Sequence, residues 1–399
     1  MTTSTINETM MSLKNQFLDG NNSALSKLPT KFVQSVTVLC NQFLTGSWEN
    51  VVEGDLEMER VTGGNSNLIF KVVNKKVPVD IVLLRIFGSE NDAITAKDTL
   101  VFSILSERDL GPKLLGVFPG GRLEEYIESR NLLYTELPYK SSLTLVAEQL
   151  AFIHCLEVPL NKNPQMMPMI NNVLDEIKSS ISDDFLVDVK FTKIVIDESL
   201  VPAIVNYQTL VDEAVFIEKV LKKMASPTVF SHNDIFGNNI LVRNNVIITE
   251  AEIVCPSSEH PFVIIDYEYA NYNVRGFDFG QIFCEFAHEY NMPELPGYEI
   301  YQNLGATDEQ IEFFVKVYLT KYHELKGIKL NDLEMEKEVD KLKVEAKIGI
   351  QLAHYFWSIW NFRQGLVAEV QGYDFHPNGI DRLGLYYEHK NRLQSILEQ

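Results

Sequence analysis

Three polar side chains at a fixed spacing constrain this chain more than any other feature of its sequence. Between Val229 and Tyr290 the chain carries Asp234, then Asn239 five residues later, and then Asp266 at the end of an apolar, strand-like run. One carboxylate of such a set can accept the proton of an attacking hydroxyl, while the amide and the second carboxylate hold Mg²⁺ against the phosphates of ATP. The set therefore predicts a phosphoryl-transfer centre.

The same interval occurs in the protein-kinase pattern H-R-D-x-x-x-x-N, and Asp266 takes the place of the Asp in D-F-G. The triplet His232-Asn233-Asp234 by itself is equally consistent with capping side chains in a polar turn. The apolar segments that flank it, and the later run Ile-Ile-Asp-Tyr-Glu, favour a catalytic loop followed by a metal-binding strand end. We therefore assign Asp234 as the base, and Asn239 and Asp266 as the metal ligands.

Composition and charge exclude several classes of protein. The 399 residues predict two or three structural units. Acidic residues outnumber basic ones 55 to 35, and the net charge of -20 disfavours nucleic acid and anionic membranes as partners. No apolar run reaches the roughly 18 residues of a membrane span, and no signal peptide is recognisable at the N-terminus. The four cysteines are widely spaced without a CxxC pair, which indicates reduced thiols, a cytoplasmic setting and no zinc site. The sequence leaves the oligomeric state open between a monomer and a homodimer.

The first part of the chain is predicted to form a small lobe around a β-sheet. Residues 1–30 read as a mobile polar tail that overlaps a helix over 28–44. Strands are expected over 56–64, 66–74 and 79–88, followed by a helix over 92–107 and strands over 114–118 and 123–127. This lobe would occupy 31–128, and the hinge that receives adenine would run from Glu125 to Asn131.

A glycine-containing turn and a basic residue indicate nucleotide binding in this lobe. The turn Gly63-Gly64-Asn65-Ser66-Asn67 is either an ordinary hairpin or a loop whose backbone N–H groups cover phosphate oxygens. Arg85 favours the second reading, because a kinase-like fold places its α/β-phosphate contact on the strand after the hairpin. An Arg there suits bidentate phosphate contact. Asp98, on the next helix, is either the partner of Arg85 or a solvated charge.

Beyond Ser129 the apolar periodicity becomes helical. Helices are expected over 143–156, 169–181, 208–224, 276–290, 309–325 and 332–366. The catalytic segment would then lie in a loop-and-hairpin insert between helices. The predicted class is α+β: a two-lobed, protein-kinase-like fold with a small antiparallel-sheet N-lobe and a large, mainly helical C-lobe over 129–399.

Aromatic and acidic side chains suggest what accepts the phosphoryl group. Trp357 and Trp360 are three residues apart and so share one helix face. They either pack in the core or form an aromatic wall for a cationic head group, for which Trp is the strongest partner. Glu268 lies two residues after Asp266, and Glu285 and Tyr290 are expected on the helix that follows. Such a set would bind a small ammonium alcohol.

With these residues in hand, the sequence resembles the choline/ethanolamine kinase family. The matching segments span about residues 60 to 362, weakly between about 160 and 225, and read VTGGNSNLIFKV, VLLRIFG, VFSILSERDLGPKLLGVFPGGRLEEYIESR, VFSHNDIFGNNILV, VIIDYEYANYNVRGFDFGQIFCEF and HYFWSIW. The resemblance implies a protein-kinase-like fold. It also implies transfer of the γ-phosphoryl group of ATP to choline or ethanolamine, the first step of the CDP-alcohol route to phospholipids.

The resemblance also implies a role for individual residues. By position, Asp234 would be the base, Asn239 and Asp266 would serve Mg²⁺, and Arg85 would contact the transferring phosphates. ATP would be bound by Thr62, Gly63, Gly64, Asn65, Ser66, Asn67, Leu68, Arg85, Glu125, Arg130, Asn131 and Asp266. The amino-alcohol pocket would be lined by Glu268, Tyr269, Glu285, Tyr290, Trp357 and Trp360.

Some departures from the family pattern bear on the acceptor. Phe236-Gly237-Asn238 stands where choline kinases usually carry Gln-Glu-Gly, and the apolar Phe236 looks like the ethanolamine branch, whereas the Gly-Gly-Asn-Ser-Asn turn looks like the choline branch. Asp98 stands where the family tends to have Glu, and the aromatic residue that follows the Trp pair is either Tyr373 or Phe375. Choline is the expected acceptor. The alternatives are ethanolamine or both alcohols, another small-molecule kinase, and a non-catalytic scaffold.

Overall fold

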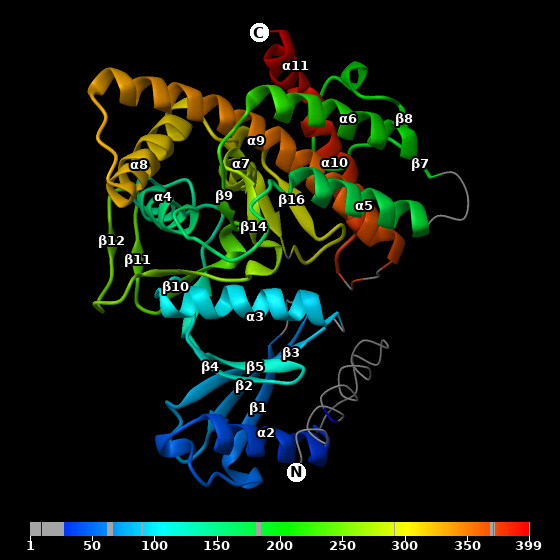
Figure 1. Ribbon diagram of the computed structural model, residues 1–399. Coiled ribbons are helices and arrows are strands. Elements are labelled where there is room, and N and C mark those ends of the chain that lie inside the picture. The colour runs from blue at the N-terminus through cyan, green and yellow to red at the C-terminus, as the bar shows by residue number, and fades with distance from the viewer. Residues whose placement is uncertain are drawn as a thin grey trace. The chain divides into compact units, whose positions relative to one another are not determined.

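The computed structural model describes Thr9 and residues 28–61, 67–88, 91–180, 185–290, 292–367, 370 and 372–398. The chain divides into two compact units, residues 1–129 and 130–399, and each is described by itself (Figure 1). The predicted mobile tail lies almost entirely outside the described residues. None of the described helices combines the length and the apolar character that a membrane span requires.

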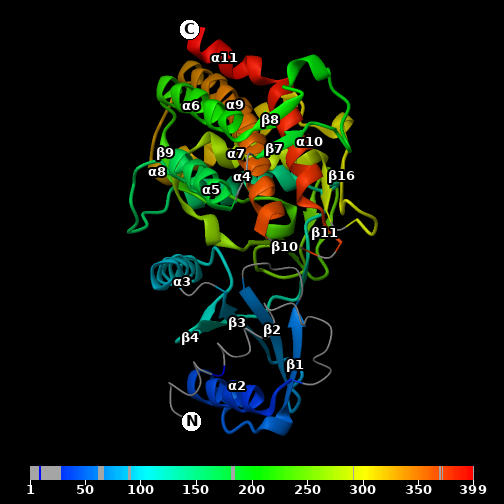
Figure 2. The same cartoon turned by 90° about the vertical axis from the view of Figure 1, so that its right-hand side faces the viewer.

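The first unit is a five-stranded antiparallel sheet with the strand order β1-β2-β3-β5-β4. Helices α2 and α3 cover its opposite faces (Figures 1 and 2). In chain order the elements are α2 (Thr30–Phe43), η1 (Gly46–Trp48), η2 (Glu53–Asp55), β1 (Leu56–Val61), β2 (Asn67–Asn74), β3 (Ile81–Phe87), α3 (Asp92–Glu107), β4 (Leu114–Phe118) and β5 (Gly121–Glu125).

Alternation along the strands explains the two faces of this sheet. Side chains that point toward α2 are apolar and buried, and they pack with Phe32, whose ring centroid lies 5.1 Å from that of Phe70. Because successive strand residues point to opposite faces, the neighbours of this apolar set point toward α3. On β3 and β5 these neighbours include Arg85, Arg122 and Glu124, so one face of the sheet is an apolar core and the other carries charged side chains.

The second unit is mainly helical, with a three-stranded sheet of order β13-β10-β6 and four short strand pairs between its described helices. Its helices are α4 (Lys140–His154), α5 (Met166–Ser180), α6 (Tyr207–Met224), α7 (Gly276–Cys284), α8 (Asp308–Lys326), α9 (Asp332–Val367), α10 (Phe375–Glu388) and α11 (Lys390–Glu398). Its strands are β6 (Ser129–Asn131), β7 (Leu186–Asp188), β8 (Ile204–Asn206), β9 (Thr228–Ser231), β10 (Ile240–Arg243), β11 (Ile247–Ile248), β12 (Ile253–Val254), β13 (Phe262–Ile264), β14 (Asn271–Val274), β15 (His288–Tyr290) and β16 (Tyr298–Ile300). Short 3₁₀ turns are η3 (Glu198–Leu200), η4 (Gly237–Asn239), η5 (Tyr267–Tyr269), η6 (Glu285–Ala287) and η7 (Gln302–Leu304).

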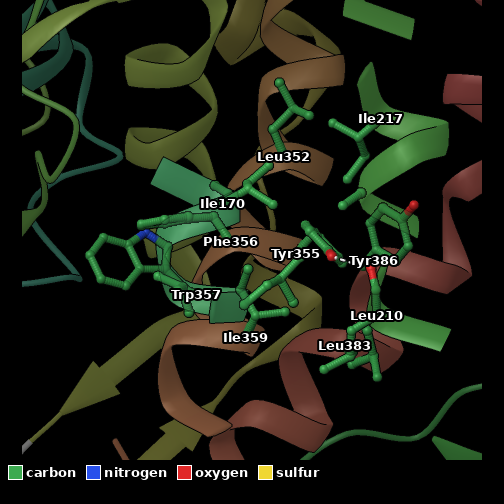
Figure 3. Close-up of a cluster of buried hydrophobic side chains, with 14 of the residues drawn as sticks. Ile170, Leu210, Ile217, Leu352, Tyr355, Phe356, Trp357, Ile359, Leu383 and Tyr386 are labelled. Atoms are coloured by element: carbon green, nitrogen blue, oxygen red, sulfur yellow. Dashed lines mark hydrogen bonds between the residues drawn. The ribbon is translucent and has the colours of Figure 1, made fainter. Parts of the chain in front are cut away.

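Helix α9 runs through the core of this unit and packs against α5, α7, α8 and α10 (Figure 1). Figure 3 shows side chains of α5, α6, α9 and α10 converging on one apolar cluster, with the Tyr355 hydroxyl bonded to the carbonyl oxygen of Leu210. Helices α7 and α9 approach closely at two glycines, because a Cβ added to Gly280 would lie 1.9 Å from the carbonyl carbon of Gly349. This close approach fixes α7 against the Trp-bearing half of α9.

The predicted helices of the second unit are confirmed within a few residues of their ends, with one exception. The helix expected over 276–290 ends at Cys284, followed by the turn η6 and by β15, which pairs with β16. Tyr290 therefore lies on a strand. The prediction that it lies on the helix was wrong. Helices α10 and α11 were not predicted.

Candidate active site

Two strand pairs bring the catalytic segment and the later Asp together. Strand β9 precedes the segment and pairs with β14, while β10 follows it and pairs with β13, with Ile240 opposite Ile264. As a result the Ile265 N–H donates to the carbonyl oxygen of Asn239 at 2.9 Å. Asp266 therefore follows directly after a residue that is bonded to the Asn of the motif.

Asn239 holds Asp234 in place. Its Nδ2 donates to the Asp234 carbonyl oxygen at 2.9 Å and to Asp234 Oδ2 at 3.1 Å. One amide group thus fixes both the backbone and the carboxylate of the predicted base. The five-residue interval between Asp234 and Asn239 brings the amide within reach of both.

Asp278 of α7 anchors the backbone that leads into Asp234. Its carboxylate is fully buried and accepts from the His232 N–H at 2.8 Å and from the Asn233 N–H at 2.7 Å. His154 of α4 also bonds Asp278, at 3.0 Å from its Nε2. Asn233 adopts a left-handed φ of 66°, a backbone conformation that needs such support.

His154 is itself fixed by its surroundings. Burial lowers the pKa of His154 despite the neighbouring Asp278, so the ring is neutral at pH 7. Because a carboxylate only accepts, Nε2 carries the proton, and Nδ1 accepts from the Tyr318 hydroxyl at 2.9 Å. The sequence analysis missed both Asp278 and His154. Asp278 could have been found from its place inside an apolar run, because a carboxylate that is buried there needs hydrogen-bond donors.

Burial and the neighbouring carboxylates both disfavour the ionised form of Asp234. Burial raises the pKa of Asp234 well above its ordinary value, and the negative charges of Asp266, Glu268 and Glu285 raise it further, against the hydrogen bond from Asn239. These acidic groups are therefore close enough to interact. Asp266 adopts a left-handed φ of 64°, and strain of this kind in a non-glycine residue is typical of functional sites.

The donor set fits a magnesium ion that is completed by phosphate. The described residues contain no group of three His, Cys, Asp or Glu side chains able to hold a metal by themselves. Asn239 uses its Nδ2 on Asp234, which leaves its Oδ1 as the atom that would coordinate, and Asp266 adds a carboxylate. Mg²⁺ is commonly held by one or two carboxylates together with waters and substrate phosphates. Two oxygen ligands from the protein therefore suffice.

Aromatic rings from two segments, η5 and α9, meet beside this centre. The Trp360 indole N–H donates to the Tyr269 hydroxyl at 2.9 Å, and the ring centroids of Tyr269 and Trp357 are 5.7 Å apart. Trp357 is buried in the core and donates to Gln281 Oε1 at 2.6 Å. Trp357 thus packs in the core (Figure 3), as one of the two readings of the Trp pair expected, and it also contacts Tyr269. A role of the pair in binding a cation stays a prediction.

The aromatic group extends to the start of α10. The Phe375 ring lies 5.9 Å from Trp360, and the Tyr373 ring lies 5.0 Å from Phe375. Both aromatic residues left open by the sequence analysis are therefore near the Trp pair, and Phe375 is the one in contact with it.

Glu285 and Tyr290 form a buried network with a residue that the sequence did not indicate. The Tyr290 hydroxyl donates to Glu285 Oε2 at 2.7 Å, and Arg382 of α10 pairs with Glu285 Oε1 at 2.7 Å. Glu285 and Tyr290 also line a small cavity together with Phe236 and its two successors. The Phe236 ring meets the Tyr290 ring edge-on, with centroids 5.8 Å apart.

In the first unit, the charged face of the sheet holds Arg85 in an ion-pair chain. Arg85 Nε lies 2.6 Å from Glu124 Oε1, Arg122 Nε lies 2.7 Å from the same atom, and Arg122 Nη1 lies 2.5 Å from Asp98 Oδ2. Asp98, which the sequence left open between a partner of Arg85 and a solvated charge, pairs with Arg122 and is linked to Arg85 through Arg122 and Glu124. Burial alone would raise the pKa of Glu124, but the two arginines outweigh it and hold the pKa below its ordinary value.

The remaining predicted nucleotide residues are placed as follows. Thr62, Gly63, Gly64, Asn65 and Ser66 lie outside the described residues. Asn67 accepts from the Gly88 N–H at 3.0 Å, Leu68 is buried in the core of the sheet, and Glu125 accepts from the Lys113 N–H at 2.9 Å. In the second unit Arg130 makes a two-pronged contact with Glu136, at 2.7 Å for each prong, and Asn131 ends β6. Their role in ATP binding stays a prediction.

Solved structures share this fold. A choline kinase from Cryptosporidium parvum superposes with a TM-score of 0.69 at 21% identity and covers 91% of this chain and 97% of its own. An ethanolamine kinase from Plasmodium vivax superposes with a TM-score of 0.67 at 18% identity and covers 94% of both chains. The protein-kinase-like fold predicted from the sequence is confirmed.

Sequence comparison identifies the family. Choline kinase A2 of Caenorhabditis elegans is 32% identical over 382 residues, which cover 90% of this chain and 86% of the relative. The human choline/ethanolamine kinase is 30% identical over 370 residues with the same coverage of 90% and 86%. A family model described as choline/ethanolamine kinase matches residues 58–387. Because this match covers most of the chain and agrees with the fold and the motif geometry, the chain belongs to the choline/ethanolamine kinase family.

Proposed function

We propose that this protein transfers the γ-phosphoryl group of ATP to choline and so forms phosphocholine, the first step of the CDP-choline route to phosphatidylcholine. The observation that carries the proposal is the fixation of Asp234 by Asn239 beside a group of aromatic rings. The first element is what proton transfer from a hydroxyl requires, and the second is what a quaternary ammonium group prefers.

In this mechanism Asp234 orients the acceptor hydroxyl and takes its proton as the oxygen attacks phosphorus. The raised pKa of Asp234 makes it a stronger base than an exposed carboxylate once it is ionised. Phosphoryl transfer depends mainly on positioning and charge stabilisation, so the bonds from Asn239 and the backbone anchor at Asp278 contribute by fixing the base. Arg85 would meet the phosphates, and Glu124 holds its guanidinium in a defined orientation.

Mg²⁺ would be held by Asn239 Oδ1 and the Asp266 carboxylate, and when bound it would neutralise negative charge on the phosphates. The ATP itself would be received by the residues named from the sequence, namely 62–68, Arg85, Glu125, Arg130 and Asn131. The four cysteines are free thiols, which supports the proposal that the enzyme works in the cytoplasm.

The acceptor end of the site supports an ammonium alcohol. Tyr269, Trp357 and Trp360 contact one another, and a cation over the face of such rings gains about 0.5–2 kcal/mol per contact. Several carboxylates nearby add negative potential. An aminoglycoside site would offer many carboxylates and few rings, so the aromatic wall favours choline over such substrates.

Ethanolamine is the second candidate acceptor. The observation in its favour is Phe236, whose apolar ring lies against Tyr290 where choline kinases usually carry a polar residue. A relative at 30% identity is named choline/ethanolamine kinase, which also supports an enzyme that uses both alcohols.

Initial rates of ATP-dependent phosphorylation test the proposal. The assay compares choline, ethanolamine and an aminoglycoside under identical conditions with Mg²⁺. We expect kcat/KM for choline to exceed that for ethanolamine by about tenfold, or about 1.4 kcal/mol of transition-state discrimination. A preference for ethanolamine would assign the second function, and turnover of the aminoglycoside alone would reject both.

A further inference from the structure

Arg382 is a buried cation of α10 that no motif of the sequence indicates. It is 3% exposed. Its Nη2 donates to Glu285 Oε1 at 2.7 Å and also to the Tyr290 hydroxyl, while the Tyr290 hydroxyl donates to Glu285 Oε2 at 2.7 Å. Three side chains from α10, η6 and β15 therefore form a closed hydrogen-bonded ring. Because a guanidinium is planar with fixed donor directions, the ring fixes both Glu285 and Tyr290.

Two members of this ring, Glu285 and Tyr290, are residues that the sequence predicts for the acceptor pocket. Glu285 and Tyr290 line the same cavity as Phe236, Gly237 and Asn238 of the catalytic segment. Arg382 Nε also donates to Asn378 Oδ1 at 3.2 Å, so a second side chain of α10 holds the guanidinium in place. Arg382 itself is not among the residues that line the cavity.

The ring changes what Glu285 can offer to a ligand. Its charge is compensated by Arg382, and each of its oxygens already accepts a donor, Oε1 from Arg382 and Oε2 from Tyr290. A primary ammonium carries three N–H donors that need acceptors, as a lysine does. A quaternary ammonium has no donor and is attracted by ring faces and by diffuse negative charge. Each carboxylate oxygen has two lone pairs, so Glu285 can still accept, but with its charge compensated it attracts a primary ammonium less strongly. A quaternary ammonium, which needs no acceptor, loses less by this compensation.

We propose that Arg382 is a positioning residue that sets acceptor preference: by occupying Glu285 and Tyr290 it favours a quaternary over a primary ammonium alcohol. The inference rests on the proposed function, because it concerns the acceptor of the same site. Arg382 acts through Glu285 and Tyr290, so it changes the binding of the acceptor and not the transfer of the phosphoryl group.

The test is the ratio of kcat/KM for choline to kcat/KM for ethanolamine in the full-length enzyme with ATP and Mg²⁺. In Arg382→Met, Glu285 loses the donor on Oε1 and the compensating charge, so we expect this ratio to fall by at least about tenfold, mainly through a lower KM for ethanolamine. We expect kcat at saturating acceptor to change by less than about threefold. Arg382→Lys keeps the charge next to Glu285 and should keep the ratio within about threefold of wild type.

Arg275→Met is the matched control. Arg275 forms another buried ion pair, with Nη2 at 3.0 Å from Glu345 Oε1, and its partner does not line the cavity. This variant should lose stability, as Arg382→Met does, but leave the acceptor ratio unchanged. A merely structural role for Arg382 would make the two variants behave alike.

Glu285→Gln keeps the proposal testable if Arg382→Met does not fold. It leaves the charge of Arg382 uncompensated beside the pocket, so KM for choline and for ethanolamine should both rise by at least about tenfold. An unchanged ratio in a folded Arg382→Met, or an unchanged KM for choline in a folded Glu285→Gln, would overturn the inference alone. A wild-type enzyme that phosphorylates neither alcohol would overturn the proposed function as well.

Discussion

Replacement of Asp278 by Asn should lower both the stability of the second unit and the activity. The Asp278 carboxylate is fully buried and accepts three hydrogen bonds, from the His232 and Asn233 N–H groups and from His154 Nε2, at 2.7–3.0 Å. An Asn has the same shape but only one acceptor oxygen. Its NH₂ group must therefore face at least one of these donors.

The loss of stability follows from the orientation of the Asn amide group that costs least. With the NH₂ group in the place of Oδ1, the bond from the Asn233 N–H is lost, and a bond to a charged group is worth about 1.5–3 kcal/mol. The other two bonds persist but weaken from charged to neutral ones, which costs about 1 kcal/mol each. We therefore expect Asp278→Asn to lower the free energy of unfolding by about 3–5 kcal/mol, a large part of the stability of a typical domain.

Two measurements check this expectation. Urea unfolding gives the stability, and steady-state kinetics with choline should show a kcat at least about tenfold lower, because the backbone before Asp234 loses its anchor. Asp212→Asn is the matched control, since Asp212 is exposed on α6 and its change should stay within about 0.5 kcal/mol. An Asp278→Asn variant with wild-type stability and wild-type kcat would refute the reasoning.

Three further predictions concern other parts of the structure. Gly280→Ala places a methyl group 1.9 Å from the carbonyl carbon of Gly349 and should lower the free energy of unfolding by about 1–3 kcal/mol in urea titrations, whereas an unchanged midpoint would contradict the close helix contact. Trp360→Phe removes the N–H that donates to Tyr269, so KM for choline should rise about fivefold with kcat retained, and a fall in kcat alone would contradict a binding role. The pKa of Glu124 is lowered in the folded state, so its contribution to stability is present above its ordinary pKa of 4.5 and is lost as the pH falls. Melting temperatures of wild type and Glu124→Gln across this range should therefore converge toward low pH, and parallel curves would contradict the ion-pair chain.

Much of the fold could be predicted because local patterns determine it. The apolar faces of α2, α5 and α6 repeat at helical spacing, and the alternation along β2 and β3 is equally regular. The segment after α7 shows where such patterns fail. Residues 285–290 continue an apolar pattern typical of a helix, but β15 pairs with β16, and no local signal reports the pairing partner.

The candidate site divides in the same way. Asp234 and Asn239 could be found because their five-residue interval brings the amide to the carboxylate. Asp266 could be found because it follows closely after β13, which pairs with β10 next to Asn239. Arg382 could not be found, since its partners Glu285 and Tyr290 lie more than ninety residues away in the sequence. For the same reason the indirect link between Arg85 and Asp98 was not visible, because it depends on two further side chains of β5.

The central claim is that Asp234 serves as the base in the phosphorylation of an ammonium alcohol. The most direct measurement follows ³¹P NMR spectra of wild type and Asp234→Asn with ATP, Mg²⁺ and choline, together with urea unfolding of both. We expect a phosphocholine signal from wild type, and from Asp234→Asn a rate lower by at least about a thousandfold at closely similar stability. A folded Asp234→Asn that forms phosphocholine at a near-native rate would contradict the account.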